Sequence, residues 1–203
     1  MITNRNKEPP VRPEFANQLI QTRRTIKPKA YSDQLIDESI LNQILENANW
    51  APTHGMTQPW RFSVFTGAAR KRLADFLAAT YQEVTSPATF KPNKYEGMKQ
   101  NALLAPAVIA IGMKRQENEK ITELDEIMAV ACAVQNIHLS ATAYGLGGFW
   151  STNVAATSDA MTRFLGLTPR DRSLGLFYLG YPTTDWPASD RDSISEKAQW
   201  FDQ

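Results

Sequence analysis

The sequence contains very little cysteine, and this scarcity excludes two kinds of site. Cys132 is the single cysteine among 203 residues, so neither an intrachain disulfide nor a multi-cysteine metal site can form. The two histidines, His54 and His138, have no acidic residues at metal-ligand spacing around them. We therefore expect no metal site.

Charge bias and long apolar runs are also missing. Lysine and arginine number 22 against 21 for aspartate and glutamate, a balance that gives no electrostatic basis for binding nucleic acid or an anionic membrane. No run of about 18 apolar residues suggests a membrane span, and residues 1–15 lack the apolar segment of a secretory signal. We expect a protein of the reducing, cytoplasmic compartment that binds neither nucleic acid nor membrane.

Several familiar catalytic motifs do not occur either. The sequence has no GxSxG nucleophile elbow, and GLGG at 145–148 lacks the GxGxxG spacing of a dinucleotide site. Cys132 falls on a segment expected to be a buried helix, which favours inert packing over reactivity. His138 lies on the same helix, where a structural role is favoured.

The hydrophobic pattern that is present is typical of one α+β domain. Residues 1–13 are polar and proline-rich and are expected to form a mobile arm, whereas 14–203 form a single domain because no linker or repeat divides them. Helical spacing predicts helices at 15–22, from Ser32 as N-cap to about 49, after Gly67, at 126–144 and at 158–166. Strands are expected at 62–65, 107–113 and 174–182. A loop is expected at 85–96, and the tail from 183 is expected to lie over the surface.

The helix at 126–144 is apolar or small around most of its circumference. A helix of this kind is expected to be buried nearly all round. Thr122 and Asp125 form a capping pair before it, and Gly145 is a C-terminal cap after it. One small domain offers too little cover for such a helix, so we expect it to form the core of a dimer.

Two short stretches carry the candidate chemistry. Arg23-Arg24-Thr25-Ile26-Lys27 places three cations and a hydroxyl on one loop, which suits an anion such as phosphate, although a solvated basic turn remains the alternative. The second stretch is APTHGMTQPW at 51–60, where two prolines restrict the backbone around His54. Core packing alone does not explain that order of residues.

The order of these elements along the chain resembles the nitroreductase family of FMN-dependent oxidoreductases. RRT-x-K is followed by AP-T-H-x-M-x-QPW-R-F, then by the alanine-rich helix that ends in YGLGGFW, and then by LGLFYLGYP. The family pattern is RRS-x-R, APS-x-x-N-x-QPW, N-L-x-L-A-A-x-x-x-G-L-G-x-x-W and a strand ending in GYP. The match spans roughly residues 16 to 195.

The resemblance implies a fold, a cofactor and a set of binding residues. The fold is an α/β/α sandwich with a mainly antiparallel sheet, assembled as an intertwined homodimer with FMN at the interface. The electron donor is NADH or NADPH, and no side chain is assigned as catalytic. The FMN contacts carried over are Arg23, Arg24, Thr25 and Lys27 at the phosphate and ring edge, Thr53, His54 and Met56 from the partner subunit, Trp150, Ser151 and Thr152 along the ring, and Arg191 at the phosphate, with Arg172 as its competitor.

The sequence departs from the family pattern at the site. Lys27 replaces an arginine, Met56 stands where asparagine is usual, and Phe149-Trp150 makes the glycine turn bulky. We expect His54 to supply the polar contact that Met56 cannot make. The expected reaction is the transfer of two electrons from NAD(P)H through the flavin to a nitroaromatic, a quinone or a related acceptor. The alternatives are another flavin reaction, such as dehalogenation or ring oxidation, and a non-catalytic flavin-binding protein.

Overall fold

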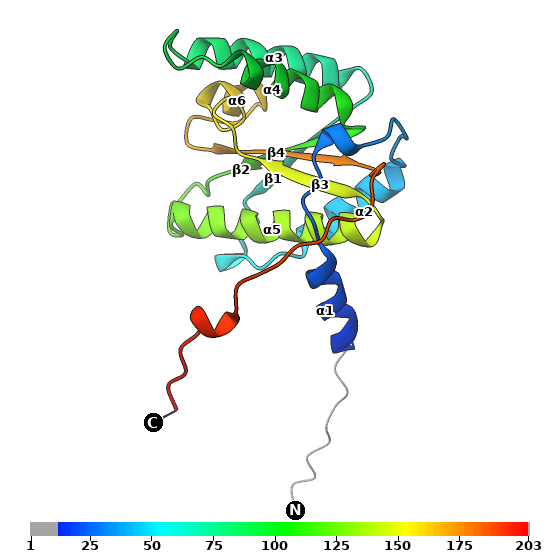
Figure 1. The fold of residues 1–203 in the computed structure, drawn as a ribbon. Helices are drawn as coiled ribbons and strands as arrows, with labels where there is room; N and C mark the ends of the chain where they lie inside the picture. The colour runs from blue at the N-terminus through cyan, green and yellow to red at the C-terminus, as the bar shows by residue number, and fades with distance from the viewer. Residues whose placement is uncertain (1–11, 203) are drawn as a thin grey trace, which may run out of the picture.

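The structure, a computed structural model, describes residues 12–202. A four-stranded sheet lies between two layers of helices (Figure 1), its order is β1-β2-β4-β3, and each neighbouring pair is antiparallel. This arrangement confirms the expected α+β sandwich. The elements are α1 (Pro13–Thr22), α2 (Glu38–Asn49), β1 (Trp60–Thr66), α3 (Ala69–Val84), α4 (Pro92–Leu104), β2 (Ala107–Met113), α5 (Glu123–Ala143), β3 (Gly147–Ser151), α6 (Asp159–Phe164) and β4 (Arg172–Gly180), with short 3-10 turns at Pro28–Ala30, His54–Met56 and Ile194–Glu196.

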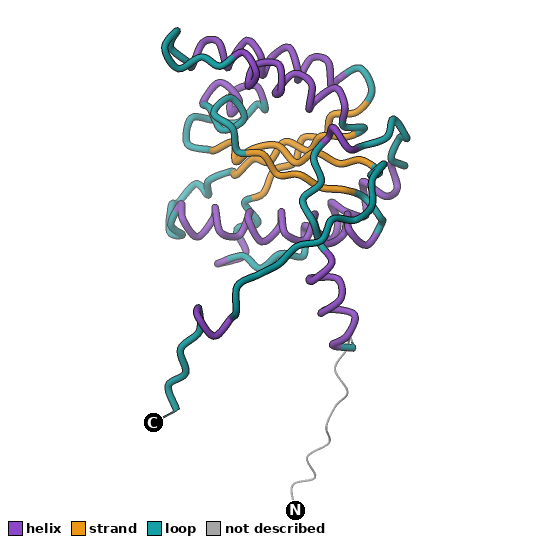
Figure 2. Tube along the Cα trace, in the orientation of Figure 1, coloured by secondary structure: helices purple, strands orange, loops and turns teal. Residues whose placement is uncertain are grey.

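The helices divide the core into two parts. Helices α2 and α5 cover one face of the sheet, and α3, α4 and α6 cover the other (Figure 2). Strand β2 is buried along its whole length, because both of its faces are covered, and its uninterrupted apolar sequence fits that position. Strands β1 and β3 form the two edges of the sheet.

The ends of α5 confirm the predicted caps. The Thr122 hydroxyl accepts a hydrogen bond of 3.2 Å from the Asp125 backbone N–H. Gly145 follows the helix with φ of 70°, a left-handed conformation that glycine adopts without steric cost.

The prediction that α5 is buried all round is wrong for the single chain. Leu124, Met128 and Cys132 are exposed on one side of the helix. Their spacing of four residues places them on one stripe that faces away from the sheet. The sequence had suggested that Cys132 packs in the core of its own chain. The structure shows instead that it is exposed there.

The start of α2 and the region before β2 also differ from expectation. Asp37, not Ser32, caps α2, and its carboxylate accepts the Ser39 N–H at 2.7 Å. The expected loop at 85–96 ends early, because α4 begins at Pro92. Proline suits the first turn of a helix, where its missing N–H is not needed.

Helix α1 and the C-terminal tail lie on the same side of the molecule. Helix α1 and the C-terminal tail both extend away from the α5 layer (Figure 1). The tail touches the body at Trp186, whose indole donates to the Thr22 carbonyl, but Trp200 is 91% exposed. The prediction that the tail lies over the surface is confirmed near its start, at Trp186 and Pro187, and is wrong for its end. The predicted arm at 1–13 falls outside the described residues, except that Pro13 begins α1.

Candidate functional site

The cationic run after α1 lies along the outer edge of β3. Thr25 pairs with Gly148 in a parallel bridge, and the Ile26 N–H donates to the Gly148 carbonyl at 3.1 Å. The Tyr31 hydroxyl donates to the Ile26 carbonyl at 2.6 Å, and the Ile26 side chain is buried. Because successive side chains of an extended segment alternate, Thr25 and Lys27 face outward, and both are exposed.

Arg23, Arg24 and Arg191 form a cluster of positive charge beside this edge. Burial lowers the pKa of Arg23, and the charges of Arg191 and Arg24 lower it further. The tail reaches the cluster because the Arg24 Nε donates to the Pro187 carbonyl at 2.8 Å. Within residues 12–202 none of the three arginines forms an ion pair with an acidic side chain. Three guanidinium groups without a carboxylate are suited to a bound anion.

Arg172 does not belong to this cluster. Its Nε lies 2.8 Å from the Glu123 carboxylate at the N-terminal end of α5. The cluster instead contacts the C-terminal half of α5, through Arg23 and His138. Of the two late arginines that the sequence offered for the anion, Arg191 is the one beside Arg23.

A cavity of about 330 Å³ opens beside β3, on the face covered by α4. Phe149 and Ser151 border it, and the Lys27 ammonium lies 5.9 Å from the centre of the Phe149 ring. Lys94 and Asn101 of α4 line its far side. The cavity thus lies next to the exposed side chains of the cationic run, and Lys94 adds a second lysine to this region.

Sequence reasoning missed Lys94 because 85–96 was expected to be a loop, and it missed Asn101 because no helix was expected at 97–104. The helical signal was present: Met98 and Ala102, four residues apart, are both buried, and Pro92 precedes them.

Trp150 lies on the opposite face of β3 from Ser151. Its indole N–H donates to the Leu174 carbonyl at 3.0 Å, and its ring packs against the core on the α5 side. Thr152 is exposed just after the strand. Among the three residues predicted in this turn, Ser151 borders the cavity.

The segment at 51–59 forms a rigid loop near the start of α5. Gly55 and Met56 have φ of 58° and 54°, so the backbone makes a left-handed turn there. The His54 side chain is 67% exposed, with Nδ1 3.9 Å from an Asp125 oxygen. Trp60 anchors the loop, since its buried indole donates to the Asn49 side chain at 2.9 Å, as the sequence predicted.

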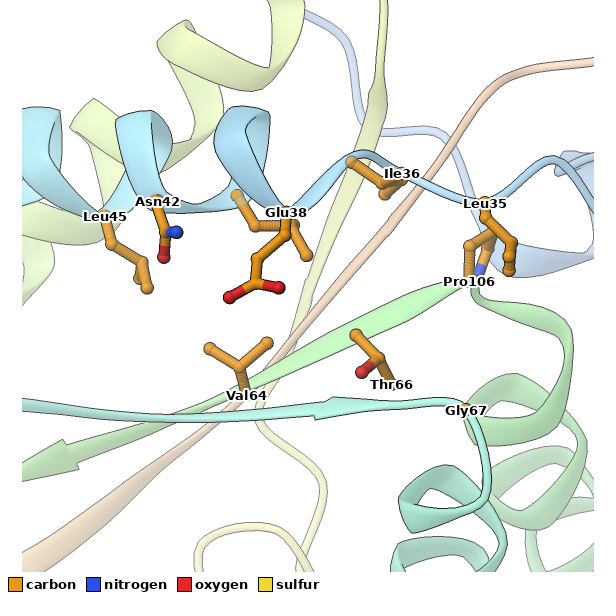
Figure 3. Close-up of a pocket in the computed structure, with 10 residues that line it drawn as sticks. Leu35, Ile36, Glu38, Asn42, Leu45, Val64, Thr66, Gly67 and Pro106 are labelled. Atoms are coloured by element: carbon orange, nitrogen blue, oxygen red, sulfur yellow. The ribbon is translucent and has the colours of Figure 1, made fainter.

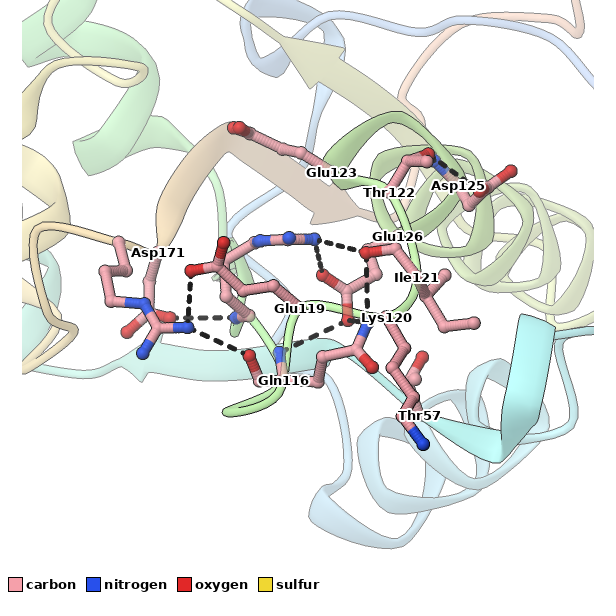
Figure 4. Close-up of polar contacts among 12 residues, drawn as sticks. Thr57, Gln116, Glu119, Lys120, Ile121, Thr122, Glu123, Asp125, Glu126 and Asp171 are labelled. Carbon is pink, nitrogen blue, oxygen red and sulfur yellow. Dashed lines mark hydrogen bonds and ion pairs between the residues drawn. The ribbon is translucent and has the colours of Figure 1, made fainter.

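A polar network supports this loop from below. Buried Glu126 pairs with Arg115 and accepts from the Gln116 backbone N–H at 3.3 Å (Figure 4). Arg115 and Gln116 also donate to the Ile121 carbonyl. The Ile121 side chain lies against Gly55, 3.4 Å from the point where a Cβ would stand.

One chain does not bring all the predicted residues together. Asp125 contacts the His54 loop, whereas His138 contacts Arg23. These two positions on α5 lie about 20 Å apart at about 1.5 Å per residue. Thr53, His54 and Met56 therefore stand at one end of the helix. Arg23, Arg24, Thr25, Lys27 and Arg191 stand near its other half.

A larger cavity of about 450 Å³ lies away from all of these residues, between α2 and β1 (Figure 3). Its lining is mostly apolar, with Ile36, Leu45 and Val64 pointing inward and Glu38 as the charged group. It holds no cation, so it does not suit an anion. In the described part of the chain, 12–202, no group of acidic, histidine or cysteine side chains is placed to hold a metal ion. Likewise, no helix there is long and apolar enough to cross a membrane.

Comparison with known proteins gives a consistent result. A model described as "Nitroreductase family" matches residues 20–181. A protein of Escherichia coli strain K12, provisionally named NAD(P)H nitroreductase YdjA, is 32% identical over 143 residues, which are 70% of this chain and 75% of that one.

Solved structures show the same fold. The nitroreductase-like family protein from Bacillus cereus aligns with a TM-score of 0.79 and 24% identity over 92% of this chain and 96% of that chain. The FMN-dependent nitroreductase NfnB from Mycobacterium smegmatis, solved in complex with NADPH, aligns with a TM-score of 0.72 and 20% identity over 93% and 99%.

Proposed function

This chain belongs to the nitroreductase family, and from that premise we propose that it binds FMN and passes two electrons from NADH or NADPH to a nitroaromatic, a quinone or a related unsaturated acceptor. The observation that carries the proposal is the cluster of three arginines, free of carboxylate partners within residues 12–202, at the edge of β3. The relatives include an FMN-dependent enzyme solved with NADPH.

The residues on this edge could hold FMN from its phosphate to its ring. Arg23, Arg24 and Arg191 would hold the phosphate, where a guanidinium fork donates two parallel hydrogen bonds. Thr25 adds a neutral donor. The cavity beside Ser151 would receive the ring, with Trp150 bracing β3 from behind and Thr152 at its end.

The protein's own contribution is orientation and charge. When bound, the flavin would supply the chemistry, namely hydride uptake at N5 and the return of two electrons to an acceptor. Lys94 lines the cavity, and the Lys27 ammonium lies 5.9 Å from the centre of the Phe149 ring that borders it. Cations near the flavin would favour negative charge on its ring. No acidic or basic side chain is required to transfer a proton, so we assign none.

We further propose that the working molecule is a homodimer with a shared site. The wall formed by Thr53, His54 and Met56 is about 20 Å along α5 from the arginine cluster of its own chain, so a second copy would supply it. Leu124, Met128 and Cys132 leave an apolar stripe on α5 exposed. Covering such a stripe is favourable, and a two-fold interface covers it on both copies.

The C-terminal tail supports an intertwined form of this dimer. It leaves the body of its own chain with Ile194, Trp200 and Phe201 exposed. Strand β1 presents an unpaired edge with Val64 exposed, between α2 and the α3 layer. An open edge and an apolar groove suit an extended segment of a second copy.

The cofactor can be tested on the purified protein. It should be yellow, and denaturation should release FMN rather than FAD, as chromatography of the chromophore will show. Steady-state turnover with NADH and with NADPH, against a nitroaromatic and a quinone panel, then measures the reaction and identifies the acceptor class. A protein that stays colourless and cannot be reconstituted with FMN would refute the proposal. Bound FMN without turnover of any acceptor would reduce it to flavin binding alone.

The shared site predicts a specific result for mixed dimers. A variant without Arg23 and Arg24 and a variant with Gly55→Val, which strains the wall, should each lose FMN. A mixed dimer has one site with both defects and one intact site, so random mixing should restore about one quarter of the wild-type sites if the dimer has two-fold symmetry. Light scattering that finds an FMN-loaded monomer, or mixing that restores nothing, would refute the shared site.

A further inference from the structure

His138 lies buried at the point where α5 meets the arginine cluster. The residue is only 7% exposed, and its ring stands edge-on to Phe177 with centroids 5.1 Å apart. A Cβ on Gly148 would lie 2.9 Å from the ring's Cδ2, so β3 approaches the imidazole as closely as glycine allows. The ring is therefore clamped between the helix and the sheet.

Both ring nitrogens face the cationic run. Nε2 lies 2.9 Å from the Arg24 carbonyl oxygen, and Nδ1 lies 3.5 Å from an Arg23 guanidinium nitrogen. A carbonyl only accepts and a guanidinium only donates. Nε2 must therefore carry the proton, and Nδ1 must present its lone pair to Arg23.

The environment keeps the ring in this neutral form. Burial lowers the pKa of His138 to about 4, with the Arg23 charge lowering it and the hydrogen bond to the Arg24 carbonyl raising it. The charged groups beside the ring are Arg23 and Arg24, both on the run. The sheet contributes Gly148 and Phe177, which carry no charge.

The bond from His138 completes a row of three backbone anchors. His138 holds the Arg24 carbonyl, Gly148 accepts from the Ile26 N–H, and Tyr31 donates to the Ile26 carbonyl. Two of these anchors act after the arginines, at Ile26. Within residues 12–202, His138 is the side chain that bonds the Arg24 carbonyl, and it is also the acceptor that α5 offers to the Arg23 side chain.

We propose that His138 is a positioning residue for the anion site: by donating to the Arg24 carbonyl and accepting from Arg23, it orients the two guanidinium groups toward the bound phosphate. This inference rests on the proposed FMN binding. It assigns a role to a position that the family pattern leaves open, since the residue falls at the x of N-L-x-L.

The test compares three substitutions on α5. His138→Leu keeps an apolar side chain but removes both polar contacts. His138→Gln keeps one donor and one acceptor, so it should rescue. Asn136→Leu is the matched control, because Asn136 also donates from α5 to a backbone carbonyl, that of Asn47 at 3.1 Å, but away from the run.

FMN affinity should separate the variants. Loss of one such hydrogen bond corresponds to an affinity loss of about 3- to 10-fold. We expect that loss for His138→Leu, recovery to within about threefold for His138→Gln, and no more than about a twofold change for Asn136→Leu. Equal losses in His138→Leu and Asn136→Leu, or wild-type affinity in His138→Leu, would overturn the proposal.

A second measurement needs no flavin. Amide hydrogen exchange at Ile26 in the FMN-free protein should become faster in His138→Leu and stay unchanged in Asn136→Leu. If the wild type binds no FMN, the proposed function fails, while this exchange result still decides whether His138 holds the run.

If His138→Leu does not fold, NMR of the His138 ring in the wild-type protein tests the proposal instead. A neutral ring protonated at Nε2 at pH 7 supports the proposal, and an Nδ1-protonated ring or an imidazolium refutes it.

Discussion

Removing Arg191 should have opposite effects on the flavin-free and flavin-loaded protein. Within residues 12–202, Arg191 donates hydrogen bonds inside its own tail, to the Ser189 side chain and the Asp190 carbonyl. Its charge lowers the pKa of Arg23, after the larger effect of burial. In the absence of an anion the two guanidinium groups therefore repel each other. Arg191→Ala should leave the stability of the FMN-free protein unchanged or raise it.

The flavin-loaded protein should lose stability through mass action. At an FMN concentration of about 100 times Kd, binding stabilises the native state by about 2.7 kcal/mol. A charge-assisted contact is worth about 1.5–3 kcal/mol, so its loss weakens binding at least about tenfold. Tenfold weaker binding reduces the stabilisation to about 1.4 kcal/mol at the same concentration. The difference corresponds to a fall in Tm of about 3–5 °C for a chain of this length.

Thermal unfolding with and without FMN measures both effects, and fluorescence titration gives Kd directly. Lys197→Ala is the matched control, since Lys197 is a cation of the same tail that already pairs with Asp192 at 3.1 Å. The affinity difference should shrink at high salt, because the lost contact is electrostatic. An Arg191→Ala protein that binds FMN as the wild type does would remove Arg191 from the phosphate site. Equal losses in both variants would attribute the effect to general tail charge.

Three further changes test other parts of the structure. Burial lowers the pKa of His138 to about 4, so its ring binds a proton more readily in the unfolded chain. The FMN-free protein should therefore lose up to about 3 kcal/mol of unfolding free energy as pH falls from 6.5 to 4. His138→Gln should flatten this part of the pH profile. Glu126→Gln leaves the Arg115 charge buried and uncompensated, so denaturant unfolding should show a loss of about 3–5 kcal/mol. His54→Ala should lower FMN affinity about tenfold with little change in Tm, since this side chain is mostly exposed in its own chain; a lower Tm with unchanged affinity would show that His54 only braces its loop.

The sequence allowed prediction of the elements whose pattern is set by local physics. The apolar run at 107–113 is the buried strand β2, and the Thr122 and Asp125 pair begins α5. Each of these depends on residues within one or two turns of one another. The same local reasoning failed at 85–96, where prolines and polar residues were taken as a loop although Pro92 begins α4.

The cap of α2 failed for a related reason. Both Ser32 and Asp37 are good capping residues by type, and tertiary packing decides between them. Leu35 is 73% exposed and does not join a helical face, whereas Ile40 and Leu41 contact the core. The helix therefore begins where its apolar stripe can be buried, after Asp37.

The site divides in the same way. Arg23, Arg24 and Thr25 could be proposed as an anion site from one contiguous run, because their chemistry is local. Lys94 and Asn101 were missed, because only the packing of α4 against β3 brings them to the cavity.

The exposed stripe of α5 links the fold to the proposed site. Covering the apolar face that a single chain leaves open on α5 would be favourable. In the proposed homodimer, a two-fold partner on this stripe would run its own α5 beside the first, so the two helices would contribute both of their ends to one interface. If the two helices are antiparallel, the His54 loop of one copy would lie toward the arginine cluster of the other. Within one chain, about 20 Å along α5 separates the His54 loop from the arginine cluster. In such an antiparallel pair, the same offset would place the loop of one chain beside the cluster of the other.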